Sequence, residues 1–136
     1  MLDCLILGDS IAVGTHQFKQ ECIAVAKGGI NSWQYNRDYV NPRKQDFNAE
    51  VVIISLGSND HKGVKTYNEL YKLRERIKAQ RVYWIVPNPE LFPKQADDVN
   101  LIAISFGDHI LRTNRYQPDR VHPSWAGYKE LGSSAK

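Results

Sequence analysis

The chain has 136 residues and a formal net charge of +3, with 42% hydrophobic and 24% charged residues. This length predicts one domain spanning residues 1-136, and the composition is that of a globular protein, which excludes a disordered chain. A charge this small gives little support to nucleic-acid binding, and no apolar run approaches the roughly 20 residues that span a bilayer. We therefore expect a globular domain that has neither nucleic acid nor a membrane as a partner.

The predicted elements alternate between strands and helices along the chain. Uninterrupted apolar runs are typical of strands buried on both faces, and they lie at 4–7, 22–26, 51–56 and 82–86. Helices are predicted between and after these runs, at 11–20, 31–40, 66–80 and 94–106, with a last helix that begins near Ser124. Residues 110–111 fit either a fifth strand or a loop. This order predicts an α/β fold with three layers, α/β/α, in which a parallel sheet of four to five strands carries helices on both faces.

The two cysteines and the first residues bear on the compartment. Cys4 and Cys22 both fall within predicted strands, where a buried free thiol behaves as a small hydrophobic side chain. A disulfide between them is possible but disfavoured. The first eight residues lack a basic leader and a cleavage site, so they are interpreted as a strand and not as a signal peptide. Together these features predict a reducing, cytoplasmic compartment.

Ligand sites in such folds form at the carboxyl ends of the strands, so the residues after each strand are the candidates for chemistry. Ser10 follows the first strand in Gly8-Asp9-Ser10, where it fits either a helix cap or a nucleophile. Gly29 follows the second strand and can bring an unobstructed N–H close to a substrate. Asn59 follows the third strand and offers a neutral amide donor. Each residue alone also fits an ordinary turn or cap.

Asp119 and His122, in the loop before the last helix, complete the set that acyl transfer through a serine requires. His122 would take the proton of Ser10 as the general base, and Asp119 would hold the imidazole in the required tautomer. The N–H of Ser10, together with Gly29 and Asn59, would form the oxyanion hole. The joint occurrence of these residues favours catalysis, because four loops at one sheet edge supply what one mechanism needs.

Other polar and aromatic residues near the same edge are assigned lesser roles. Asn88, in the loop after the fourth strand, and Trp125, just after His122-Pro123, are expected to contact the substrate. Asp60 is expected to brace the Asn59 loop. His61 could be taken for a metal ligand, but a two-metal phosphatase would need Asp-x-His near the N-terminus, so no metal site is predicted.

Four blocks of this sequence occur in the order found in one enzyme family. They are Gly8-Asp9-Ser10, Gly29, Gly57-Ser58-Asn59-Asp60 and Asp119-Arg120-Val121-His122-Pro123. The chain therefore resembles the SGNH hydrolases, also called the GDSL esterases and lipases, over nearly its whole length. The resemblance implies a flavodoxin-like fold without a metal or an organic cofactor. It also implies a nucleophile at Ser10, an oxyanion hole from Ser10, Gly29 and Asn59, and a triad completed by Asp119 and His122.

The chain departs from that family in two ways. It is shorter than expected, so the loops that wall an acyl pocket must be small. The pair Gly28-Gly29 leaves two candidates for the oxyanion donor, of which Gly29 is preferred because Ile30-Asn31-Ser32 after it matches the start of a helix.

The function predicted is hydrolysis of carboxylic esters through an acyl-enzyme, with a short acyl or acetyl group on a small molecule or a carbohydrate. The first alternative is a module of the same fold that only binds or serves a structural role. A second is a flavodoxin-like phosphate or nucleotide binder that uses the same loops as N–H cradles. The sequence predicts no oligomeric state.

Overall fold

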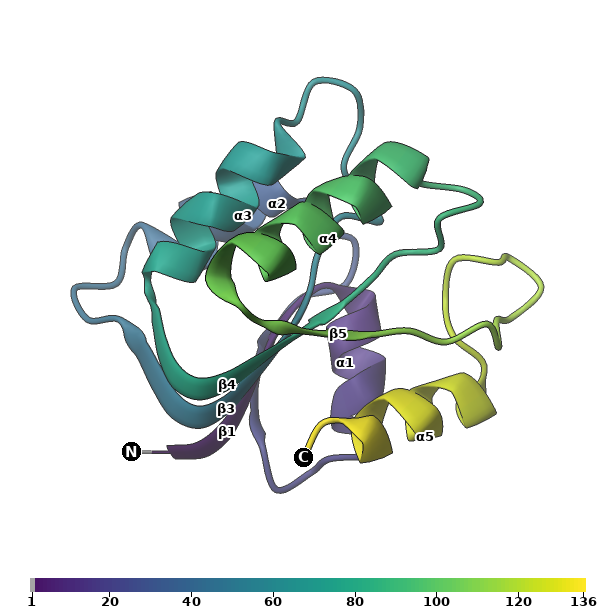
Figure 1. The fold of residues 1–136 in the computed structure, drawn as a ribbon, viewed down its shortest axis with the longest axis horizontal. Helices are drawn as coiled ribbons and strands as arrows, with labels where there is room; N and C mark the ends of the chain where they lie inside the picture. Colours follow the sequence, from purple (N-terminus) through teal and green to yellow (C-terminus); the bar gives the residue numbers. More distant parts are fainter. Residues whose placement is uncertain (1) are drawn as a thin grey trace.

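A parallel sheet forms the middle layer of the protein (Figure 1), which is described for residues 2–136 by a computed structural model. Within these residues the sheet has five strands in the order β2-β1-β3-β4-β5. The strands are β1 (Leu2–Gly8), β2 (Ile23–Ala26), β3 (Phe47–Ser55), β4 (Ile77–Ile85) and β5 (His109–Leu111). Every pairing is parallel, so the carboxyl ends of all five lie along one edge.

Helices cover both faces of this sheet, which confirms the predicted three-layer α/β/α fold. One face carries α1 (Ser10–His16) and α5 (Trp125–Ser134), which lie together at the lower right in Figure 1. The other face carries α2 (Ser32–Tyr35), α3 (Thr66–Glu75) and α4 (Pro93–Phe106). A π-helical turn, η1 (Asn36–Val40), continues α2, so the helix predicted at 31–40 is formed in two parts.

Two hydrophobic cores lie on the two faces, because successive residues of a strand point to opposite sides. Leu7 and Ile54 belong to the core under α2, α3 and α4. Their neighbours Ile6 and Ile53 belong to the core under α1 and α5. All four side chains are fully buried. This burial on both faces explains why β1 and β3 show up in the sequence as uninterrupted apolar runs.

The helix predicted at 66–80 is wrong in its last residues, since α3 ends at Glu75 and β4 already begins at Ile77. Ile77 pairs with Phe47 at the start of β3, and Ala79 pairs with Ala49. The segment alternates apolar and polar residues, with its lysine and glutamine exposed. Such alternation is typical of a strand that is half-buried at its amino end. Because these residues pair with β3, they form a strand and do not continue the helix.

The other boundaries agree more closely. The first helix is shorter than predicted, since α1 ends at His16. Residues 110–111 lie in a true strand, β5, which pairs with the end of β4. Ser124 caps the last helix through a hydrogen bond that its Oγ accepts from the N–H of Gly127, at 3.2 Å. Within residues 2–136, no helix has both the length and the apolar character that crossing a membrane requires.

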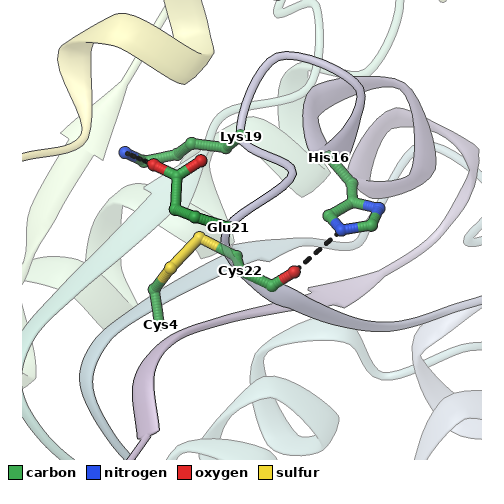
Figure 2. The surroundings of a disulfide bond; sticks show 5 residues. All are labelled: Cys4, His16, Lys19, Glu21 and Cys22. Atoms are coloured by element: carbon green, nitrogen blue, oxygen red, sulfur yellow. Dashed lines mark hydrogen bonds and ion pairs between the residues drawn. A yellow bond between two sulfur atoms is a disulfide. The ribbon is translucent and has the colours of Figure 1, made fainter.

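The expectation of free thiols is wrong, because Cys4 and Cys22 form a disulfide (Figure 2). Leu5 of β1 pairs with Ile23 of β2, so the residue before each lies directly opposite the other, with Cα atoms 4.7 Å apart. A disulfide requires this proximity. His16 Nε2 donates a hydrogen bond of 2.8 Å to the Cys22 carbonyl beside the bridge. Disulfides persist mainly in oxidising surroundings, so the argument for a reducing compartment loses the support of the two thiols.

Candidate active site

The turn after β1 holds Ser10 in a fixed position at the start of α1. Gly8 has φ +136°, and a Cβ at this position would lie 1.8 Å from the carbonyl oxygen of Ser55, so only glycine lets β1 and β3 approach here. Asp9 caps α1, since its Oδ1 accepts hydrogen bonds of 3.0 Å from the Ile11 N–H and from Ser55 Oγ. Ser10 is therefore the first residue of a capped helix, and the residue before it is anchored to β3 at the sheet edge.

The structure brings the predicted nucleophile, base and carboxylate into one chain of contacts. Ser10 Oγ lies 2.8 Å from His122 Nε2, and His122 Nδ1 lies 2.7 Å from Asp119 Oδ2. Asp119 Oδ1 accepts two more hydrogen bonds, from the backbone N–H groups of Val121 and His122. These bonds, that of the imidazole first, lower the pKa of Asp119 to about 2. The carboxylate is thus ionised at any ordinary working pH and keeps its acceptor toward the imidazole.

The loop that carries Asp119 and His122 is tied to the rest of the edge by backbone contacts. The Gln117 N–H donates to the His122 carbonyl at 2.8 Å, and the Asn88 side-chain amide donates to the Arg120 carbonyl at 2.8 Å. Arg120 has φ +62°, a left-handed conformation that is unusual for a side chain of this size. The loop after β4 therefore holds the tight turn between the carboxylate and the imidazole.

The candidate oxyanion donors lie on the loops after β2 and β3. The Asn59 side-chain amide donates one hydrogen to the Ile30 carbonyl at 3.0 Å, which leaves its second hydrogen for another acceptor. A Cβ at Gly28 would lie 3.7 Å from the Cβ of Ser10, and Gly29 follows with φ +79°. Gly28 thus lies next to the nucleophile, and the assignment of the donor to Gly29 stays a prediction.

Asp60 joins these two loops, as the sequence led us to expect. Its carboxylate is buried and accepts hydrogen bonds of 2.8 Å from the Ser32 N–H, 2.7 Å from Ser32 Oγ and 2.7 Å from Thr66 Oγ1. Ser32 begins α2 just after the glycine loop, and Thr66 begins α3. One carboxylate therefore fixes the starts of two helices and holds the Asn59 turn between them.

Asp9 has an electrostatic role that the sequence reasoning missed. The side chain is fully buried, and within residues 2–136 its Oδ2 makes no hydrogen bond. Burial raises the pKa of Asp9 to about 7, even though Ser55 and backbone N–H groups favour the charged form. Burial also raises the pKa of Tyr128 to about 12, with contributions from the negative charges of Asp9 and Asp119. Ser55, a serine at the end of the third strand, was the feature of the sequence from which a hydrogen-bond partner of Asp9 could have been predicted.

The two residues expected to contact substrate lie in different surroundings. Asn88 is buried and lines a cavity of about 650 Å³ between the loop after β4 and the segment after β5. Trp125 is 67% exposed, packs edge-on against Phe18 at a ring distance of 5.3 Å, and has the Lys129 ammonium 5.2 Å from its ring. It does not line that cavity. Contact of either residue with a substrate stays a prediction.

The sheet order and the helices on both faces define a flavodoxin-like α/β/α fold, and its carboxyl edge carries a serine, a histidine and an aspartate in hydrogen-bond contact. Two solved structures are similar to the chain over nearly their full lengths. One is a member of the lipolytic protein G-D-S-L family from Veillonella parvula DSM 2008, with a TM-score of 0.68, 12% identity, and coverage of 98% of this chain and 95% of that one.

The other is a putative lipolytic protein of the G-D-S-L family from Desulfitobacterium hafniense DCB-2, with a TM-score of 0.57, 16% identity, and coverage of 98% of this chain and 97% of that one. No protein-family model matches the chain, and no curated protein does. At these identities the likeness shows the fold, which is the fold that the four sequence blocks imply.

Proposed function

We propose that the protein is a serine hydrolase of carboxylic esters, of the SGNH kind. The observation that carries the proposal is the contact chain at the sheet edge, with 2.8 Å between Ser10 Oγ and His122 Nε2 and 2.7 Å between His122 Nδ1 and Asp119 Oδ2. These distances allow proton transfer from the hydroxyl to the imidazole. The likeness to two G-D-S-L lipolytic proteins supports the same class of reaction.

The reaction proceeds in two transfers. Ser10 Oγ attacks the ester carbonyl carbon while its proton passes to His122 Nε2, which gives a tetrahedral oxyanion and an imidazolium. The bond from carbon to the alcohol oxygen then breaks, and His122 returns the proton to that oxygen, so that an alcohol leaves and an acyl-enzyme remains. Water attacks the acyl-enzyme in the same manner, which releases the acid and restores the Ser10 hydroxyl. Asp119, ionised throughout, stabilises the imidazolium in both transfers.

The oxyanion is stabilised by donors from three elements. The Ser10 N–H belongs to the first turn of α1, where the backbone donors of a helix are free and its dipole favours negative charge. Asn59 contributes the hydrogen that the Ile30 carbonyl does not use. Gly29, or its neighbour Gly28, contributes a backbone N–H. A neutral amide at Asn59 stabilises the developing charge without drawing the His122 imidazole away from Ser10.

A short acyl group fits this site better than a long one. The cavity that touches Gly28 and Gly29 measures about 170 Å³, below the roughly 300–1,000 Å³ of sites that enclose drug-sized ligands. Lys27, Arg37 and Asp38 also line it, and these charged groups do not favour an aliphatic chain. Acetyl and similarly small groups are therefore the expected acyl substituents.

Hydrolysis of p-nitrophenyl acetate and labelling by a fluorophosphonate test the proposal. The wild type should hydrolyse the ester and lose that activity on labelling at Ser10, whereas Ser10→Ala should show only background hydrolysis and no labelling. Ser105→Ala is the matched control, because Ser105 is an exposed serine on α4 whose Oγ donates to a carbonyl of its own helix. A folded wild type that is neither labelled nor faster than Ser10→Ala would contradict the proposal and favour a non-catalytic module.

A further inference from the structure

A cavity of about 650 Å³ lies between the loop that leads from β4 to α4 and the long segment that leads from β5 to α5. Gln117 and Arg120, from the part of that segment that also carries Asp119 and His122, line it. The two segments face each other at the carboxyl edge of the sheet (Figure 1). The volume falls within the roughly 300–1,000 Å³ typical of sites for small organic ligands. The proposed chemistry at Ser10 uses none of the side chains that line this cavity.

The cavity adjoins the general base through its own wall. Gln117, which lines the cavity, donates its backbone N–H to the His122 carbonyl, and its side-chain amide donates to the Pro123 carbonyl at 3.0 Å. The wall is thus one hydrogen bond from the backbone of His122. In ester hydrolysis the departing alcohol receives its proton from the imidazole, so the alcohol portion of a substrate lies on the side of this residue.

The lining of the cavity combines polar side chains with apolar surface and carries balanced charges. Apart from Val86 and Pro89, every lining side chain has a group that forms hydrogen bonds. Arg120 pairs with Glu90 across the cavity wall. Within residues 2–136, Arg112 and Glu130 also line the cavity, and neither takes part in an ion pair. Two cations thus stand against two anions.

This lining discriminates among the ligands of an esterase. Burial of an alkyl chain among so many polar groups would remove their hydration without replacing it, which disfavours a lipid. A phosphorylated or otherwise strongly anionic ligand would meet the carboxylates of Glu90 and Glu130 as well as the two guanidinium groups. A neutral molecule with many hydroxyl groups satisfies both kinds of charge, because each hydroxyl can donate to a carboxylate and accept from a guanidinium or an amide.

We propose that this cavity binds the alcohol portion of the substrate and that this portion is a neutral, polyhydroxylated group such as a sugar ring of a glycan. The inference rests on the proposed ester hydrolysis and extends it from the acyl side of the scissile bond to the alcohol side. Arg112 and Glu130 supply opposite charges to the hydroxyls, and the Asn114 side chain, which also lines the cavity, adds an amide.

Two esters that differ in their alcohol portion distinguish binding in this cavity from the reaction at Ser10. The acetate of p-nitrophenol lacks hydroxyls for the cavity, whereas cellobiose that carries one acetyl group has them. The ratio of kcat/KM for the sugar ester to that for p-nitrophenyl acetate should fall by about tenfold or more in Arg112→Ala and in Glu130→Gln, as loss of a hydrogen bond to a charged group predicts. Arg115→Ala should keep the wild-type ratio, because Arg115 is an exposed arginine of the same segment that does not line the cavity.

The outcomes separate the two proposals. If the wild type hydrolyses p-nitrophenyl acetate but both cavity variants keep the wild-type ratio, or the sugar ester is not cleaved at all, the cavity inference is overturned and the ester hydrolase stands. If neither ester is cleaved, the hydrolase proposal fails, and the cavity inference is then tested by sugar binding alone. Disaccharides of differing hydroxyl configuration, titrated into ¹⁵N-labelled Ser10→Ala, should shift amide resonances of residues 112–117. Shifts from none of them, or only from residues 27–38, would overturn it.

Discussion

Reduction of the Cys4–Cys22 disulfide should lower the stability of the protein by a calculable amount. The bridge closes a loop with a sequence separation of 18 residues. The chain-entropy relation for such a loop gives about 3 kcal/mol of stabilisation, because the bridge restricts the unfolded chain. For a domain of this length the entropy of unfolding converts that free energy into a melting temperature lower by about 10 °C.

The assay is thermal unfolding followed by circular dichroism, with and without a phosphine reductant. Thiol titration of the denatured protein should find no free thiol before reduction and two afterwards, one from each cysteine. The double variant Cys4→Ala, Cys22→Ala should melt near the reduced wild type and should not respond to reductant. Because the bridge joins β1 and β2 at the end of the strands away from Ser10, activity measured well below the melting temperature should change little.

Two results would refute this reasoning. A melting temperature that does not change on reduction would mean that the loop is already restricted in the unfolded chain, so that the bridge adds nothing. Two free thiols in protein purified under oxidising conditions would mean that the bridge does not form. In either case the pairing of Cys4 with Cys22 could not serve as a source of stability.

Three further predictions concern the site. Asn59→Ala should lower kcat on p-nitrophenyl acetate by about 10²–10³ while the protein stays folded, and an unchanged rate would remove Asn59 from the oxyanion hole. Asp60→Ala should both destabilise the protein in urea and lower kcat, because three buried hydrogen bonds to Ser32 and Thr66 lose their acceptor; Asp60→Asn, which keeps one acceptor oxygen, should be milder, and equal behaviour of the two variants would contradict the bracing role. Because burial raises the pKa of Asp9 from 3.8 to about 7, its contribution to stability is lost as pH rises between these values, by roughly 4 kcal/mol. From pH 4 to pH 8 the unfolding free energy of the wild type should therefore fall relative to that of Asp9→Asn. A difference between the two proteins that does not change with pH would exclude a raised pKa.

The strands that are buried on both faces could be predicted from the sequence, whereas their half-buried ends could not. An uninterrupted apolar run such as 51–56 predicts a strand buried on both faces, because all of its side chains must be buried against other apolar groups. Ile77 fits the helical spacing from Leu70 and Leu73 as well as the alternation with Ala79. What decides is the pairing of Ile77 with Phe47, thirty residues earlier in the chain, and no local pattern contains that contact.

The same distinction holds for the site. The placement of Ser10, Asn59 and His122 at the sheet edge could be predicted because each follows or precedes a recognisable element, and parallel strands bring such residues to one edge. The contacts that hold them could not, since they join segments far apart in the sequence. Ser55 bonds to Asp9 across two strands, and Asn88 bonds to the carbonyl of Arg120. The disulfide was missed for the same reason, because it depends on the register of β1 against β2.

The candidate site draws its parts from both layers of helices. Ser10 begins α1 and His122 precedes α5 on one face of the sheet, whereas the glycine loop and the Asn59 turn lead into α2 and α3 on the other. Ser10 and the candidate donors Gly29 and Asn59 therefore lie in different helical layers and are aligned only while both layers stay packed on the sheet. Hydrolysis should thus report on the packing of both layers, and a denaturant that loosens either layer should abolish turnover before the sheet itself unfolds.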